Sequence, residues 1–76
     1  MTLWEAPAKF IASIRNIDSN LSPLVAGRLR EMGIDQGQSI LCLRRGPFNG
    51  AMVVQVGDCI YSLEQNIARQ ISIQAA

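Results

Sequence analysis

The sequence predicts a mainly β fold, a small closed barrel of about five short strands with one short α-helix inserted after the first strand. Short apolar runs recur at regular spacing and are separated by turn-forming residues, which is typical of small barrels. One segment carries both the start and the stop signals of a helix. With 76 residues, the chain has room for a single domain, which we place over 1–76.

The chain begins with a leader and a strand. Residues 1–8 read as a loose leader with two apolar anchors, Leu3 and Trp4. In the next segment, KFIASIRNI at 9–17, apolar side chains recur at alternate positions from Phe10 onward. This alternation is the period of a β-strand.

A short helix is expected to begin after Ser22. Serine is a favourable N-cap residue, and Pro23 occupies the first helical position, where its missing N–H costs nothing. Gly27 stands inside this helix, where it either allows close packing or is simply tolerated. Gly33 fits the left-handed position that ends a helix, and Gly37 fits a second left-handed position in the turn that follows.

The second half of the chain reads as strands joined by turns. The expected elements are a strand over 38–45, a turn-rich loop over 46–50, strands over 51–57 and 58–63, a helical turn over 64–70 and a closing strand over 71–73. Alternation within these strands separates an inward from an outward face. The side chains predicted to point inward are those of Ile40, Cys42, Met52, Val54, Val56, Cys59, Tyr61 and Leu63.

The chain is nearly neutral and has no membrane-spanning run. Its net charge is +1, whereas general nucleic-acid binding needs many Lys and Arg side chains to neutralise phosphates. We therefore expect no nucleic-acid partner. No stretch approaches the roughly 20 apolar residues that cross a bilayer, and no signal-peptide pattern is present. These features predict a soluble cytoplasmic protein without direct membrane insertion.

Residue types that carry catalysis and metal binding are scarce. The chain has no histidine, no Gly-rich phosphate loop and no nucleophile elbow, and its acidic residues are scattered. Cys42 and Cys59 lie in separate apolar segments, and both are expected to be buried structural thiols, with a disulfide or redox pair as the alternative. We therefore expect no enzymatic activity, no cofactor and no metal site.

Three segments together carry a family resemblance. They are RLREMGI at 28–34 with Gly37 after it, LRRGPFNG at 43–50, and SLEQNIARQISI at 62–73. With these segments in this order and spacing, the chain resembles the FeoA family of small cytoplasmic proteins associated with bacterial ferrous iron uptake. The resemblance runs over nearly the whole chain.

The resemblance implies an SH3-like β-barrel, the fold also used by the C-terminal domain of DtxR-type metal-dependent repressors. It implies one partner, the membrane ferrous iron (Fe²⁺) transporter FeoB, whose cytoplasmic portion carries a GTP-binding domain. The implied role is that of an accessory or regulatory protein that acts by protein–protein binding. Such a protein lies in the cytoplasm, or at the inner face of the cell membrane through its partner.

An outward apolar set is the first candidate interaction surface. By strand alternation, Leu41, Val53 and Ile60 point outward, where a soluble barrel normally carries polar residues. A contiguous set of this kind marks either self-association into a homo-oligomer or docking of a partner. The alternative is that the leader covers the set through Leu3 or Trp4.

The loop after the second strand is the other candidate surface. Arg44 and Arg45 precede a hairpin whose tip carries Phe48, and an aromatic residue beside arginines is typical of interaction hot spots. Alternatively, Phe48 folds back to cap the barrel. A further hypothesis is GTPase activation, with Arg44 or Arg45 acting as a finger on the GTP-binding domain of the transporter.

Two other function classes compete with a transporter accessory. The first is a transition-metal-binding or metal-sensing module, against which the lack of histidine counts. For a protein without such a site, added metal is expected to leave the melting temperature unchanged. The second is a nucleic-acid-binding small barrel, against which the near-neutral charge counts.

Overall fold

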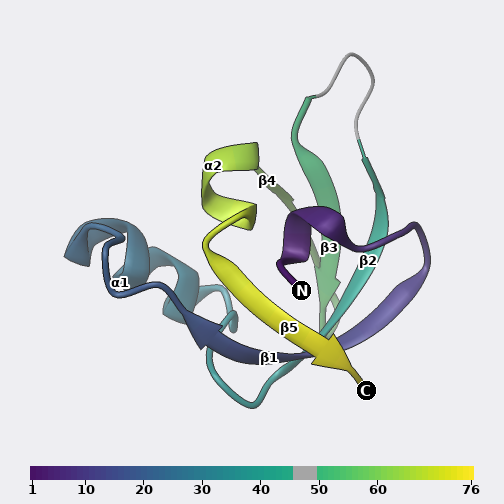
Figure 1. Ribbon diagram of the computed structural model, residues 1–76, viewed down its shortest axis with the longest axis horizontal. Helices are drawn as coiled ribbons and strands as arrows, with labels where there is room; N and C mark the ends of the chain where they lie inside the picture. The colour runs from purple at the N-terminus through teal and green to yellow at the C-terminus, as the bar shows by residue number, and fades with distance from the viewer. Residues whose placement is uncertain (46–49) are drawn as a thin grey trace.

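The computed structural model describes residues 1–45 and 50–76, with the backbone alone at Arg45. Its elements, in chain order, are η1 (Leu3–Glu5), β1 (Phe10–Ile17), α1 (Pro23–Glu31), β2 (Ser39–Arg45), β3 (Met52–Val56), β4 (Cys59–Leu63), α2 (Gln65–Ala68) and β5 (Ile71–Ala75). The predicted mainly β fold is confirmed, with five strands and a short helix after the first of them (Figure 1).

The strands form one antiparallel sheet in the order β4-β3-β2-β1-β5. In Figure 1, β1 and β5 run across the direction of β2 and β3, so the sheet curls around the core. β4 and β5 are the two edges, and among the described residues no ladder joins them. The short helix α2 connects them along the chain. The ladders therefore do not close the barrel, which corrects the expectation of a closed one.

β1 has a neighbouring strand on each side. Residues 10–13 pair with β2, and residues 12–17 pair with β5. On the β5 side the register shifts between Ile14 and Asn16, which is a β-bulge. A bulge bends a strand and increases its twist. The bend lets β1 pair with β2 in its first half and with β5 in its second half.

The core lies on the inner face of the curled sheet. Every strand and helix contributes almost fully buried side chains, which are Leu3, Ala6, Ala12, Ile14, Leu29, Ile34, Ile40, Cys42, Met52, Val54, Leu63, Ala68, Ile71 and Ile73. The inward alternation predicted for β2 and β3 is confirmed by Ile40, Cys42, Met52 and Val54, and Val56 packs against the core from a half-buried position. Aliphatic side chains fill this core because the chain has only one Trp, one Tyr and two Phe.

The N-terminal segment is part of the fold, which corrects the expectation of a loose leader. The Thr2 N–H donates to the Glu5 carboxylate (2.7 Å), and this bond lowers the pKa of Glu5. Leu3 is wholly buried in the core, and Trp4 packs against the core from a half-buried position. The two predicted anchors are therefore confirmed.

α1 begins as the sequence predicts. The Ser22 hydroxyl accepts a hydrogen bond from the Val25 N–H (3.3 Å), and Pro23 is the first residue of the helix. The cap satisfies a backbone donor that has no partner within the helix, and the proline has no N–H that would need one.

Gly33 ends α1 in the left-handed conformation, with a φ of 86°. Its N–H donates to the Arg30 carbonyl (3.0 Å), and the Ile34 N–H donates to the Leu29 carbonyl (2.8 Å). These two bonds form a Schellman motif, in which an apolar residue after the glycine packs against the last turn. Leu29 and Ile34 are both buried in the core, so this joint anchors α1 to the sheet.

The two cysteines occupy different environments. Cys42 is buried in the core as predicted, whereas Cys59 is exposed, which corrects the prediction that Cys59 is a buried structural thiol. Cys59 is the first residue of β4 and lies beside the β3–β4 turn. At this end of the strand, a side chain on the inner face extends past the core and stays in contact with solvent. β3 separates the strands of the two thiols, which places them about 10 Å apart across the sheet. A disulfide between them is excluded by that separation, and both thiols are free.

We expect Gly27→Ala to stabilise the protein by about 0.5–1 kcal/mol, because alanine has a higher helix propensity than glycine. A Cβ atom at Gly27 would meet no described heavy atom within 4 Å, so this glycine is tolerated and is not needed for close packing. Equilibrium unfolding in urea measures the change. A lower free energy of unfolding for the variant would contradict this account.

We expect Gly33→Ala to destabilise the protein more than Gly37→Ala. Both glycines have a φ of 86°, so both variants pay the left-handed penalty of about 1–2 kcal/mol. Only at Gly33 would the new Cβ meet a neighbour, Val56 Cγ1 at 3.1 Å. Comparing the free energies of unfolding of the two variants in urea isolates the effect of that contact. Equal losses of stability would show that Val56 moves away from the new Cβ atom without destabilising the fold.

We expect one thiol to react quickly with a water-soluble disulfide reagent in the folded protein. The reactive thiol is Cys59, which is exposed, whereas burial raises the pKa of the Cys42 thiol and hides it from the reagent. Each protein thiol that reacts releases one thiolate from the reagent, so the absorbance of this thiolate at alkaline pH counts the reactive cysteines, first in buffer and then in denaturant. Cys59→Ser should remove the fast phase and Cys42→Ser the denaturant-dependent one. The opposite assignment would contradict the placement of β4.

Candidate functional site

Four directly paired residues cross the outer face of the sheet. Ile11 in β1 lies opposite Leu41 in β2. Leu41 lies opposite Gln55 in β3, and Gln55 lies opposite Ile60 in β4. Directly opposed residues on one face are close enough for their side chains to interact. We call these four residues the outer row, and three of them are aliphatic.

The outer row is most accessible at its ends. Ile60 is 62% exposed and Ile11 is 59% exposed, whereas Leu41 between them is half-buried. Leu3 lies in the core and Trp4 packs against the core. Ile60 is therefore not covered by the leader, and the alternative that the leader covers the outward apolar set is wrong for this residue.

Val53 and Arg44 continue this surface toward the β2–β3 hairpin. Val53 is half-buried and lies on the same face as Gln55, two positions away along β3. Arg44 pairs with Val53 after a register shift in β2, and its side chain is exposed. The structure thus brings Leu41, Val53, Ile60 and Arg44 to one face of the sheet.

Two of the predicted site residues fall outside this description. The backbone of Arg45 pairs with Met52, but the description does not include the Arg45 side chain. Phe48 lies outside the described residues altogether. An interaction role for Arg45 and Phe48 stays a prediction from the sequence.

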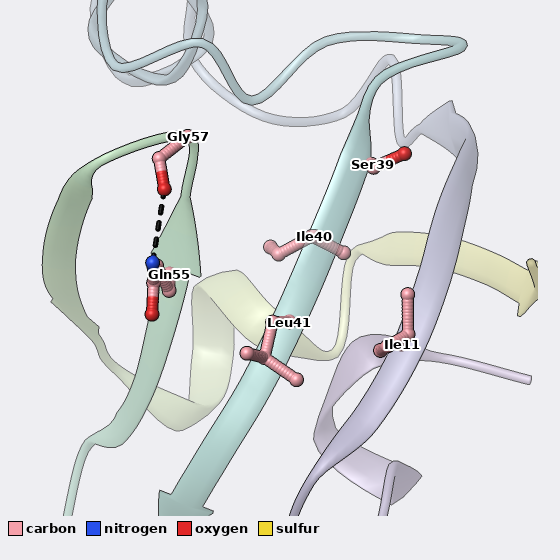
Figure 2. A pocket seen from close by; sticks show the side chains of 6 residues that line it. All are labelled: Ile11, Ser39, Ile40, Leu41, Gln55 and Gly57. Atoms are coloured by element: carbon pink, nitrogen blue, oxygen red, sulfur yellow. Dashed lines mark hydrogen bonds between the residues drawn. The ribbon is translucent and has the colours of Figure 1, made fainter.

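A shallow hollow of ≈ 170 Å³ indents the outer row. Figure 2 shows its lining, which comes from three adjacent strands and the β3–β4 turn and consists of Ile11, Ser39, Ile40, Leu41, Gln55 and Gly57. The Gln55 amide nitrogen donates to the Gly57 carbonyl (3.0 Å), which ties its polar end to the turn. The hollow therefore offers mainly aliphatic carbon, and it fits an apolar side chain of a partner better than a charged ligand.

Ile11 is the member of the outer row that the sequence reasoning missed. The alternation that assigned Phe10, Ala12 and Ile14 to one face of β1 also places Ile11 on the other. An isoleucine on that outward face is the same signal that singled out Leu41 and Ile60. Only the register of β1 against β2 shows that Ile11 and Leu41 are direct neighbours.

The remaining polar chemistry of the described residues is sparse. A hydrogen bond with the Cys59 thiol raises the pKa of the Tyr61 hydroxyl, with desolvation and the charge of an ionised Cys59 acting in the same direction. Across residues 1–45 and 50–76, no three His, Cys, Asp or Glu side chains gather as a metal site would require. In the same part of the chain, no helix has the length and apolar character needed to cross a bilayer.

Three solved structures show what this fold resembles. The iron(II) transport protein A of Clostridium thermocellum has a TM-score of 0.90 and 21% identity, over 100% of this chain and 46% of that one, so this chain spans less than half of its length. FeoA of Stenotrophomonas maltophilia, solved with zinc, has a TM-score of 0.83 and 28% identity, over 97% of this chain and 89% of that one. The manganese regulator SloR has a TM-score of 0.84 and 16% identity, over 100% of this chain and 34% of that one.

The sequence comparisons are more specific than the shared fold. No curated protein sequence matches the chain significantly. The FeoA domain profile, in contrast, matches residues 1–75. The Stenotrophomonas protein is described as a prokaryotic SH3-domain protein, in agreement with the SH3-like sheet found here. The chain therefore belongs to the FeoA family.

Proposed function

We propose that this protein is a cytoplasmic accessory factor of ferrous iron uptake that acts by binding the cytoplasmic portion of a FeoB-type GTP-binding transporter. Membership of the FeoA family supports this role. The similar protein from Stenotrophomonas maltophilia is described as a candidate activating factor for bacterial ferrous iron transport. The structural observation that carries the proposal is the outer row, an exposed aliphatic surface on a sheet face that is normally polar.

The outer row has the features of a docking site for another protein. Its two most exposed members, Ile11 and Ile60, flank the half-buried Leu41 and the hollow beside it. Interfaces draw most of their affinity from a few apolar anchors that fill pockets and are surrounded by residues that exclude water. In this arrangement an apolar side chain of the transporter enters the hollow, and the two isoleucines pack around it.

Arg44 is a charged neighbour of this surface on the β2 side. It lies opposite Val53, next to the outer row, and its side chain is exposed. A guanidinium at the rim of an apolar surface pairs with a carboxylate or phosphate and orients the partner. Arg44 therefore connects docking on the sheet face with the hypothesis of an arginine acting on the GTP-binding domain.

Binding to the full-length FeoB-type transporter of the same organism, with and without GTP, tests the proposal. We expect Ile60→Ser and Ile11→Ser each to weaken binding about 5-fold to 10-fold, which corresponds to about 1–1.4 kcal/mol for a lost apolar anchor. Both side chains are largely exposed, so the variants should stay folded. Leu24→Ser is the matched control, because Leu24 is 71% exposed on α1, which lies to one side of the strands (Figure 1) and lines no part of the hollow.

Equal losses for the control and the outer-row variants would reject the outer row as the docking site. No saturable binding in any nucleotide state would reject the transporter as the partner. The GTPase rate in the same samples separates docking from activation. If Arg44→Ala or Arg45→Ala abolishes a rate change while binding persists, the arginine acts on the GTP-binding domain.

A transition-metal-binding or metal-sensing module is the alternative function. Its structural support is the likeness to the manganese regulator SloR, which at 16% identity extends to the fold alone. No described cluster of ligand side chains favours it over the accessory role.

A further inference from the structure

The two edges of the sheet are treated differently by the chain. The outer edge of β5 is covered by the N-terminus, because the Ile73 N–H donates to the Met1 carbonyl (2.8 Å) and Thr2 forms a β-bridge with Ser72. β4 forms its ladder with β3 alone. In the described part of the chain, no backbone hydrogen bond outside the helices and ladders involves β4. One edge is therefore blocked and the other is open.

The hairpin geometry identifies the backbone groups at the open edge. β3 and β4 are joined by the two-residue turn Gly57–Asp58, with a φ of 60° at Gly57, as a type II′ turn requires. In such a hairpin the flanking residues, Val56 and Cys59, form the first hydrogen-bonded pair, and bonded pairs then alternate. Ile60 therefore directs its N–H and C=O away from β3, and so does Ser62 two positions later.

The side chains of β4 do nothing to block this edge. Natural edge strands are protected by charged residues, prolines or bulges. The sequence of β4, CIYSL, contains no charged residue and no proline, and its ladder with β3 is regular, without a register shift. Ile60 is 62% exposed, and Cys59 and Ser62 are also exposed. The nearest charges are Asp58 and Glu64, which flank the strand.

We propose that β4 is a self-association edge that pairs antiparallel with β4 of a second copy of this chain, with Ile60 facing Ile60 across a two-fold axis. The flanking charges select this register. Pairing centred on Tyr61 would set Asp58 opposite Glu64 of the second copy twice, and like charges directly opposite each other are unfavourable. Pairing centred on Ile60 sets Asp58 opposite the neutral Ser62 and brings together the most exposed apolar side chain of the strand.

This pairing joins the outer rows of the two copies. Ile60 is the last member of the row, so two copies extend it without interruption across the axis. Edge pairing leaves the outer face uncovered, and the dimer therefore presents two hollows on one continuous surface. A five-residue strand buries little area, well below the roughly 1,200 Å² of a stable complex. The dimer is accordingly a weak one, and this inference does not depend on the transporter as partner.

Sedimentation equilibrium from about 10 µM to 1 mM tests the dimer, a range set by the small interface. We expect concentration-dependent dimerisation of the natural chain. Ile60→Pro should weaken it at least tenfold, because proline removes an N–H that faces the open edge and takes no part in the β3 ladder. Ile60→Val is the matched control, since it keeps both the N–H and a β-branched apolar side chain. A monomer at every concentration, or equal dimerisation of both variants, would overturn the proposal.

Disulfide trapping provides a second test that does not depend on the proline variant folding. In a Cys59→Ser background, Ile60→Cys places two thiols in a directly opposed pair about 5.5 Å apart between Cα atoms, within the range for a disulfide. Ser62→Cys lies on the same face but about 13 Å from its counterpart in this register. We expect mild oxidation to cross-link the first variant and not the second. Preferential cross-linking of Ser62→Cys would overturn the register, and cross-linking of neither would overturn the interface.

Discussion

The double pairing of β1 is the constraint on which the rest of the structure depends. This strand pairs with β2 along its first half and with the C-terminal strand β5 along its second, and the bulge between Ile14 and Asn16 provides the bend between the two. Without the second pairing, Ile71 and Ile73 would lose their place in the core. The same pairing brings β5 beside the N-terminus, where Met1 and Thr2 cover its outer edge. One bent strand thus sets both the core and the protected edge.

A small aliphatic core explains why so much apolar surface remains outside. The inner face of the sheet, η1 and the two helices enclose the buried side chains, and nothing described in the chain is left to cover the outer face. Ile11, Leu41 and Ile60 therefore stay on a surface where burial would require another protein. The two proposals use different parts of this region: the transporter occupies the sheet face, while a second copy occupies the β4 edge. Ile60 belongs to both parts: its side chain lies on the face, while its backbone N–H and C=O lie at the edge.

The candidate site was only partly predictable, because strand alternation assigns faces without assigning neighbours. Alternation placed Leu41, Val53 and Ile60 outward, and the structure puts them on one face with Arg44. It did not join Ile11 to them, since that requires the β1–β2 register. It also failed at Cys59, where an inward position beside the turn extends past the core and is exposed. The leader was misjudged for a similar reason, because the burial of Leu3 depends on a cavity formed by segments far away in the sequence.

The sequence by itself determined the local features of this protein: the order of the elements, the N-cap at Ser22, the helix end at Gly33 and the motifs of the FeoA family. The helix start and end depend on hydrogen bonds between residues only a few positions apart, so the sequence around each of them is enough to predict them. Only the tertiary structure decided that the ladders leave β4 and β5 unpaired with each other, that the N-terminus covers β5, and that β4 stays open. Strand pairing between distant segments depends on the register and bend of the whole sheet, and no local pattern encodes which edge the chain end will reach.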